Sequence, residues 1–273
     1  MLLIESLLWQ CMAIAIGACI GSFLNVVIYR VPAGLSILYP PSRCPHCLRQ
    51  LAPRDNIPVI GWFLIKGKCR YCHTPVSWRY PAIEAFTAFL FWAVAAYFGL
   101  RQPLIISFLY AMLLSWLLAL SMIDLDTQTL PNSLTQSGLI LGVAYQILAG
   151  LILSNTNVAN QLIFGIGGAV LGIWLLDIMR IAGRVLWQKD AMGGGDPKLA
   201  AMIGMWLGWE SVLLTIMVAA ALGTLVGAIA IGFQKITQQQ PIPFGPFLSF
   251  GGVISLFFGN SIITAYLSWF GIE

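Results

Sequence analysis

The sequence predicts an all-α polytopic membrane protein with about eight transmembrane helices and a small cytoplasmic domain between helices 1 and 2. Hydrophobic residues make up 59% of the 273-residue chain and charged residues only 9%, and the mean hydropathy is +0.87. A soluble domain carries about 25% charged residues. The apolar residues form repeated long runs, and eight of the 14 basic residues fall in one loop. So much apolar surface requires a lipid bilayer as its partner, and we expect no nucleic-acid partner.

The apolar runs divide into eight segments. The first has no basic stretch before it, so we expect a retained helix and no cleavable signal peptide. The sixth has only 11 residues, which reach about 17 Å against a hydrocarbon core of about 30 Å. It must start from the polar Asp196 end, thin the bilayer, or stay shielded among other helices. The predicted segments are Leu7–Tyr29, Ala82–Leu100, Leu104–Ile123, Leu134–Leu153, Gln161–Met179, Leu199–Trp209, Ser211–Phe233 and Phe247–Phe270.

The basic residues predict the orientation of these segments. Cytoplasmic loops are enriched in Lys and Arg, so the basic loop between the first two segments should be cytoplasmic. Threading eight segments from that loop puts both termini on the opposite side of the membrane. The eight basic residues of the loop are Arg30, Arg43, Arg49, Arg54, Lys66, Lys68, Arg70 and Arg79. Arg180, Arg184, Lys189, Lys198 and Lys235 then also fall on the cytoplasmic side, and Arg101 falls outside.

The same loop contains two CxxC pairs, Cys44 with Cys47 and Cys69 with Cys72. This spacing suits a structural zinc ion held by four thiolates, and it also permits two disulfides. A reducing cytoplasm disfavours disulfides, and so small a domain needs a stabilising metal, so we predict zinc. The predicted domains are a first transmembrane helix (1–29), a cytoplasmic four-cysteine domain (30–80) and a seven-helix membrane domain (81–273).

Acidic residues are scarce, and a charge in or beside a membrane segment is costly enough to suggest a function. Six of the ten have an ordinary explanation, and four of these, Glu5, Asp190, Glu210 and Glu273, are expected to be solvated. Asp177 precedes Arg180 by three residues, a spacing typical of a helical ion pair. Glu84 opens the second segment, where it can compensate the helix N-terminus.

Three other aspartates lie where two segments end or begin. Asp124 and Asp126 end the third segment, and Asp196 opens the sixth after three glycines. Asp196 suits a helix N-cap. The predicted topology also brings it to the same cytoplasmic mouth as the end of the third segment, where two carboxylates can divide the roles of acid and base in peptide hydrolysis. Asp124 and Asp126 point about 200° apart on a helix, so at most one faces Asp196, and spacing alone does not choose.

Several motifs resemble the type IV prepilin peptidases, also called leader peptidase/N-methyltransferases, of the GxGD aspartyl protease class. They run in the family's order over nearly the whole chain. They are GSFLNVVIYRVP (21–32), SRCPHC (42–47), DNIPVIGW (55–62), RYPAIE (79–84), IDLDTQTLPNSLT (123–135), GGGDPKLAAMIGMWLGW (193–209) and PIPFGPFL (241–248).

The resemblance implies a catalytic pair. The second catalytic aspartate of the family is the D of GxGD, which here is Asp196 after Gly193 and Gly195. The first lies seven residues before a proline, which selects Asp124 over Asp126.

The resemblance also gives Asp126 and Lys198 supporting positions beside that pair. The chain departs from the family's LPD motif, because Asn132 stands where a carboxylate is usual.

The resemblance further implies a multi-pass protein of the bacterial inner membrane with its active site at the cytoplasmic face. Its substrates would be type IV prepilins or pseudopilins of type II secretion. After removal of a basic leader, the same enzyme would methylate the new N-terminus with S-adenosylmethionine. No GxGxxG motif after a strand indicates a Rossmann site for that methyl donor, and the family's methylation is attributed to the four-cysteine region.

Two other functions fit some of these features. Intramembrane aspartates also serve ion- or proton-coupled carriers, and Gly-rich broken helices occur in transporters. A non-catalytic assembly scaffold would use the four-cysteine domain for binding and would not need the aspartates.

Overall fold

The computed structural model describes residues 2–99, 101–153, 157–187, 193–233 and 242–271. Within these ranges every regular element is a helix, which confirms the all-α prediction. Seven of the described helices are long and apolar enough to cross a membrane, so the chain is a multi-pass membrane protein. Lys189 and Lys235, two of the residues used to predict orientation, lie outside the described ranges. The helices are α1 (Leu2–Arg30), η1 (Pro53–Asn56), α2 (Ile60–Leu64), α3 (Arg79–Phe98), α4 (Leu104–Thr127), α5 (Asn132–Ile152), α6 (Val158–Trp187), α7 (Asp196–Gly232) and α8 (Gly245–Trp269).

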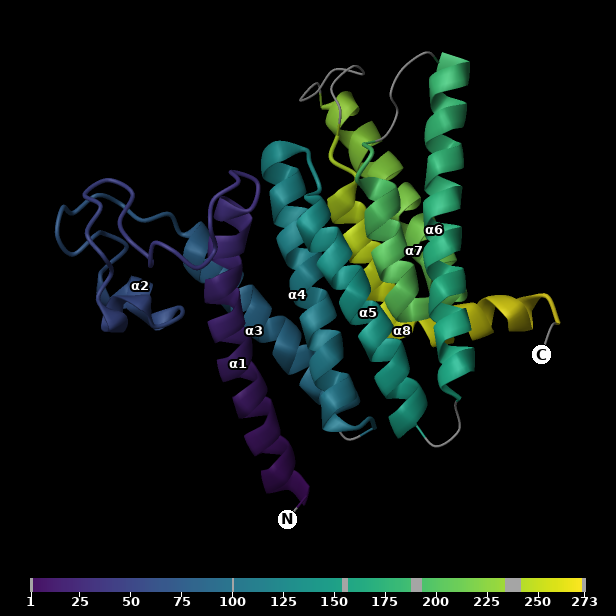
Figure 1. Ribbon diagram of the computed structural model, residues 1–273, viewed down its shortest axis with the longest axis horizontal. Coiled ribbons are helices and arrows are strands. Elements are labelled where there is room, and N and C mark those ends of the chain that lie inside the picture. The colour runs from purple at the N-terminus through teal and green to yellow at the C-terminus, as the bar shows by residue number, and fades with distance from the viewer. Residues whose placement is uncertain (1, 100, 154–156, 188–192, 234–241, 272–273) are drawn as a thin grey trace. The chain divides into compact units, whose positions relative to one another are not determined.

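The chain forms two compact units, Met1–Ser115 and Trp116–Glu273, and the boundary falls within α4. In the first unit α1 packs against α3. Gly21 of α1 permits this close approach, because a Cβ there would meet the backbone of Glu84 in α3. The four-cysteine domain, with η1 and α2, connects these two helices and appears in dark blue in Figure 1.

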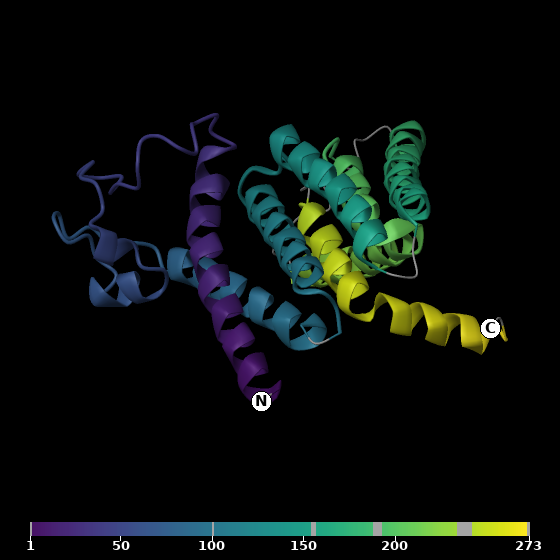
Figure 2. The same cartoon turned by 60° about the horizontal axis from the view of Figure 1, so that its bottom comes forward.

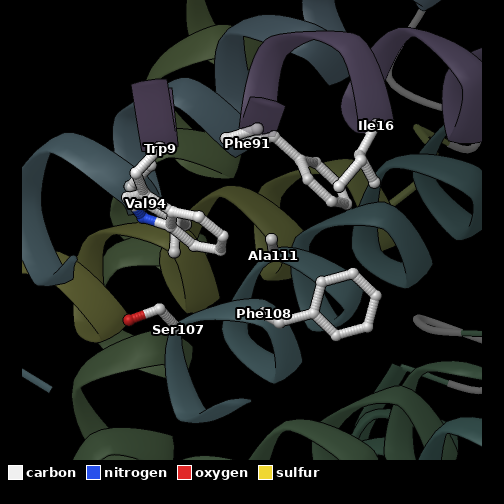
Figure 3. Close-up of a pocket in the computed structure, with 9 residues that line it drawn as sticks. Trp9, Ile16, Phe91, Val94, Ser107, Phe108 and Ala111 are labelled. Atoms are coloured by element: carbon white, nitrogen blue, oxygen red, sulfur yellow. The ribbon is translucent and has the colours of Figure 1, made fainter. Parts of the chain in front are cut away.

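A small cavity lies among α1, α3 and the first half of α4, all in the first unit (Figure 3). Aromatic and aliphatic side chains line it, including Phe91 and Phe108, whose rings meet edge to face. Trp9 Nε1 and Ser107 Oγ also line it, and both are buried without a hydrogen-bond partner among the described residues. The packing of the first unit therefore leaves two polar atoms uncompensated in an apolar wall.

In the second unit α7 is the central helix, and it packs against α5, α6 and α8. The view in Figure 2 shows the C-terminal part of α8, in yellow, extending beyond the neighbouring helices of this unit. Nearly all side chains after Gly259 are exposed, in keeping with that arrangement.

The sixth and seventh predicted segments are the two parts of one continuous element, α7, on either side of a break. This helix is broken at Gly208, which has φ 82° and ψ 177°. Ser211 lies beside Gly259 in the middle of α8, whereas Gly227 lies against Ile242, just before α8 begins. The start of α7 also lies at that end of α8, because Asp196 lies beside Asp124 and the Gly245 amide donates to Asp124. The chain therefore reverses at Gly208, and both ends of α7 lie on one side of the unit (Figure 1).

The part of α7 before the break, Asp196–Leu207, is the short sixth segment of the prediction, and we call it the half-helix. Other helices shield it, which is one of the three arrangements expected for so short a segment. Its 12 residues reach about 18 Å. From Leu199 to Met205 every residue is buried. Gly168 of α6 and Gly204 of α7 face each other so closely that a Cβ on either would meet the opposite backbone. Small residues at such crossings are typical of helix packing in membranes.

Polar groups freed by the break have partners inside the bundle. The side-chain amide of Gln146 in α5 donates to the carbonyl oxygens of Met205 at 2.7 Å and of Trp206 at 3.4 Å. In lipid an unpaired backbone carbonyl costs several kcal/mol, so α5 makes the half-helix tolerable.

Candidate active site and metal centre

The four cysteines predicted as zinc ligands lie together. Cys44 Sγ is 3.7 Å from Cys72 Sγ, Cys47 Sγ is 3.9 Å from Cys69 Sγ, and all four sulfur atoms lie within 4.8 Å of one another. A tetrahedral zinc ion with Zn–S bonds of about 2.3 Å requires sulfur separations of about 3.8 Å. Sulfur atoms in a disulfide are about 2.05 Å apart, so this geometry fits a shared metal and not two disulfides.

Each CxxC pair forms the same tight turn. The Leu48 amide donates to Cys44 O, and the His73 amide donates to Cys69 O, both at 2.9 Å. Leu48 and His73, which follow the second cysteine of each pair, both adopt a φ of 58°. The two turns are thus equivalent halves that present their sulfur atoms to one point.

Hydrogen bonds already favour the thiolate at two of these cysteines. The Thr74 hydroxyl lies 3.3 Å from Cys72 Sγ, and together with the Thr74 amide it lowers the pKa of Cys72 to about 6. The amides of Cys47 and His46 lower the pKa of the Cys44 thiol. Zinc binds thiolates, so the cluster has the donor chemistry as well as the geometry for this metal.

The second turn is tied to η1 by a buried carboxylate. Arg70, between Cys69 and Cys72, donates from Nε to Asp55 Oδ2 at 2.9 Å, and its Nη2 also contacts Asp55 Oδ1. This guanidinium holds the pKa of the Asp55 carboxyl below its usual value. The DNIPVIGW motif therefore has a structural role beside the cysteine cluster that the sequence analysis did not find.

Asp124 and Asp196 lie together in the second unit. Asp124 is in the last turn of α4, and Asp196 is the first residue of α7. The two side chains are close enough to interact electrostatically, and their residues are 5% and 4% exposed. The N-cap of α7 is Gly195, so the expectation that Asp196 caps this helix is wrong by one residue. Its carboxylate is instead directed toward Gly193 and Asp124.

The glycines before Asp196 fit closely around it. The Asp196 carboxylate is hydrogen-bonded to the backbone of Gly193. A Cβ on Gly195 would come within 2.6 Å of Leu130 Cβ, a distance that no side chain tolerates. Gly195 therefore lets the loop between α4 and α5 approach the site.

The remaining predicted positions are peripheral. Asp126 is exposed, on the side of α4 away from the buried Asp124, as the helical geometry requires. Lys198 Nζ donates to Asn132 Oδ1 at 2.6 Å, which joins the start of α7 to the start of α5. Asn132 thus keeps the acceptor oxygen that an aspartate would supply, without its charge.

The two acidic residues given structural explanations have different outcomes. Asp177 and Arg180 form the predicted ion pair, at 2.9 Å. The expectation for Glu84 is wrong, because α3 begins at Arg79 and has no acidic residue in its first turn. Glu84 Oε2 instead accepts a hydrogen bond from the Val59 amide at 2.6 Å. Val59 has a φ of 61° and a ψ of −57°, and the Ile60 amide donates to Pro58 O, so this buried carboxylate binds the central amide of a γ-turn just before α2.

Gly245 is a further residue of this site that the sequence did not predict. Its amide donates to Asp124 Oδ2 at 2.9 Å, and this bond is buried. The only signal in the sequence was the PIPFGPFL motif, in which residues 242–248 are described and glycine stands at the start of α8.

Two protein-family models match this chain, one in its N-terminal part and one in its C-terminal part. A model described as the bacterial peptidase A24 N-terminal domain matches residues 15–98, and a model described as the type IV leader peptidase family matches residues 111–228. A prepilin leader peptidase/N-methyltransferase of Stutzerimonas stutzeri is 36% identical over 94% of this chain and 93% of its own. The chain belongs to the type IV leader peptidase family. This confirms the resemblance drawn from the motifs.

Other members of the type IV leader peptidase family give the same result. The proteins of Aeromonas hydrophila and Pseudomonas aeruginosa that carry the same name are 36% and 34% identical, over 92% and 95% of this chain and 91% and 94% of their own. No solved structure matches the chain. Nothing in these comparisons supports the carrier interpretation.

Proposed function

We propose that this protein is a prepilin leader peptidase and N-methyltransferase, and that Asp124 and Asp196 carry out its hydrolytic step. The observation that carries the assignment is the burial of these two carboxylates side by side, although 72 residues separate them in sequence. The names of its relatives supply the substrate class.

Two adjacent carboxylates suffice for peptide hydrolysis. One takes a proton from a water molecule as the water oxygen attacks the scissile carbonyl carbon, and the other donates a proton to the carbonyl oxygen. The tetrahedral intermediate then breaks its C–N bond, and the leaving nitrogen receives a proton. The products are a leader peptide ending in a carboxylate and a mature chain with a free amine.

The placement of the pair fits substrates with a short basic leader followed by an apolar helix. Both aspartates lie at helix ends, next to the loop of residues 193–195. By the distribution of Lys and Arg we assign this end to the cytoplasm and both termini to the opposite side. The scissile bond would then meet the aspartates at the bilayer surface.

Methyl transfer requires a second set of groups. We assign it to the region between Arg30 and Arg79, where Cys44, Cys47, Cys69 and Cys72 would hold one structural zinc ion. Four thiolates leave no open coordination position, so the metal stabilises this domain and takes no part in chemistry. S-adenosylmethionine supplies the methyl group to the amine freed by cleavage.

The test is cleavage of a purified prepilin by the purified chain in detergent, read as a leader-sized mass shift. We expect Asp124→Asn and Asp196→Asn each to reduce kcat by about 10²- to 10⁴-fold, the usual contribution of acid–base groups. Asp126→Asn should reduce it far less, because that side chain is exposed. Glu210→Gln, an exposed acid near the Gly208 break, is the matched control. Full cleavage by either dyad variant would refute the role of that aspartate.

A further inference from the structure

The amide of Gly245 is the one described backbone donor that comes from another helix to a member of the proposed dyad. It belongs to the first residue of α8, and its bond to Asp124 Oδ2 spans 121 residues of sequence. We propose that Gly245 is a positioning residue for leader cleavage. Its amide fixes the rotation of the Asp124 carboxylate, so that Oδ1 is left for the reaction. This inference rests on the proposed dyad.

The start of α8 makes this donor available. The first turn of a helix has amides without intrahelical partners. The N-cap Phe244 offers no side-chain acceptor, and Pro246 has no amide hydrogen. The Gly245 amide is therefore the first free donor of α8, and the Asp124 carboxylate is its partner.

The position also requires the absence of a side chain. A Cβ on Gly245 would lie 2.7 Å from Asp124 Oδ2 and 3.1 Å from Asp124 Cγ. Such contacts are too short, so any other residue would displace the carboxylate or the start of α8. The constraint does not come from the backbone angles, because Gly245 has no positive φ. Glycine is needed here for the close approach alone.

A hydrogen bond to one carboxylate oxygen has a specific consequence. A free carboxylate rotates about its Cβ–Cγ bond, so its oxygens spend part of the time in orientations that cannot exchange a proton with the substrate or water. A buried donor on Oδ2 holds a single orientation at no cost during the reaction, and such preorganisation is a large part of catalysis. The PIPFGPFL motif thus contributes to the hydrolytic step through Gly245, whose amide orients the Asp124 carboxylate.

An alternative is that Asp124 serves only to cap α8. An asparagine at position 124 still offers Oδ1 as an acceptor to the Gly245 amide, so Asp124→Asn would preserve a cap. Loss of cleavage in that variant with an unchanged thermal midpoint would separate chemistry from capping.

The experiment measures kcat and KM for prepilin cleavage by Gly245→Ala. We expect kcat to fall by about 10- to 100-fold with little change in KM, because the carboxylate moves and the substrate contacts do not. The matched control is Gly259→Ala in the same helix, where a Cβ meets its nearest neighbour at an ordinary 3.7 Å. Methylation of an already cleaved pilin should persist in both variants, which reports on the folded state of the rest of the chain.

A second variant removes the donor without adding bulk. Glycolic acid at position 245, introduced by ligating a synthetic C-terminal segment, replaces the amide N–H with an ester oxygen. The inference requires that kcat fall here as well. Unchanged kcat in the ester variant would overturn it, even if Gly245→Ala were inactive or failed to fold. If Asp124→Asn itself cleaves, the proposed dyad has failed, which is a separate outcome from the failure of Gly245.

Discussion

At the scale of single residues, the buried carboxylates of this protein have three different uses. Asp55 binds a guanidinium, Glu84 binds a strained backbone amide, and Asp124 lies beside a second carboxylate. Among the described residues only the last arrangement puts two like charges together, which costs free energy and therefore suggests a function. That contrast, and not burial alone, singles out the catalytic candidate.

Asp55 gives a prediction about pH. Arg70 lowers the pKa of Asp55 in the folded chain, so its stabilising contribution is complete above the unfolded value of about 3.9 and is lost only as pH falls through the lower folded value. We expect Asp55→Asn to lower the temperature at which the purified chain releases zinc, by the same amount at every pH from about 5 to 8.

The control for this experiment is Arg54→Gln, which changes an exposed neighbour of Asp55. It should shift the release temperature much less. A difference between wild type and Asp55→Asn that disappeared between pH 7 and pH 5 would show that the folded pKa of Asp55 is not depressed.

The sequence predicts much of the site because its residues carry unusual chemistry. Two CxxC pairs have few explanations, and an aspartate after three glycines in an apolar chain is conspicuous. The choice of Asp124 over Asp126 needed the motif, since helical geometry only says that they face apart. Gly245 was unpredictable for the opposite reason: its contribution is a backbone amide, and every residue except proline has one.

At the scale of elements, the half-helix of α7 shows where sequence reasoning about length succeeds. Eleven apolar residues cannot cross a bilayer, and the structure resolves this with a reversal at Gly208 inside a shell of other helices. The segment bounds came from apolar runs, so they missed the polar first turn of α7 and the last turn of α4. The side chains that pair with the broken helix, such as Gln146, which donates to Met205 O, are determined by tertiary packing and cannot be predicted from hydropathy.

Gly208 should be irreplaceable. Its φ of 82° with ψ of 177° lies in a region that only glycine occupies readily, and a Cβ would overlap the ring of Phe164. We expect Gly208→Ala to cost about 3 kcal/mol or more, from backbone strain together with overpacking. Thermal unfolding in detergent would measure the loss.

Gly167 of α6 supplies the control, because no atom lies within 4 Å of a Cβ at that position. Gly167→Ala should be neutral or stabilise the chain by up to about 1 kcal/mol through helix propensity. Equal midpoints for the two variants would contradict the geometry assigned to Gly208.

At the scale of the whole molecule, the two family models and the two compact units divide the chain at nearly the same place. The N-terminal model ends at residue 98, the peptidase model begins at residue 111 within α4, and the boundary between the units follows Ser115 in the same helix. The four cysteines belong to the first unit, and both proposed catalytic aspartates belong to the second. If each unit has its own core, the two activities should be separable by damage confined to one unit.

Metal removal tests this separation. On the proposed zinc site, four thiolates hold the small domain between Arg30 and Arg79 together, and we expect a domain of this size to lose its fold when the metal is removed. We expect a chelator strong enough to extract zinc from the detergent-solubilised chain to abolish methylation of a cleaved pilin while leader cleavage persists. Cys44→Ser with Cys72→Ser should reproduce this result without a chelator, and Cys11→Ser with Cys19→Ser, in the exposed face of α1, should affect neither activity. Joint loss of both activities would instead mean that the metal supports the peptidase unit too, and the function of the four-cysteine domain would have to include presenting the leader to Asp124 and Asp196.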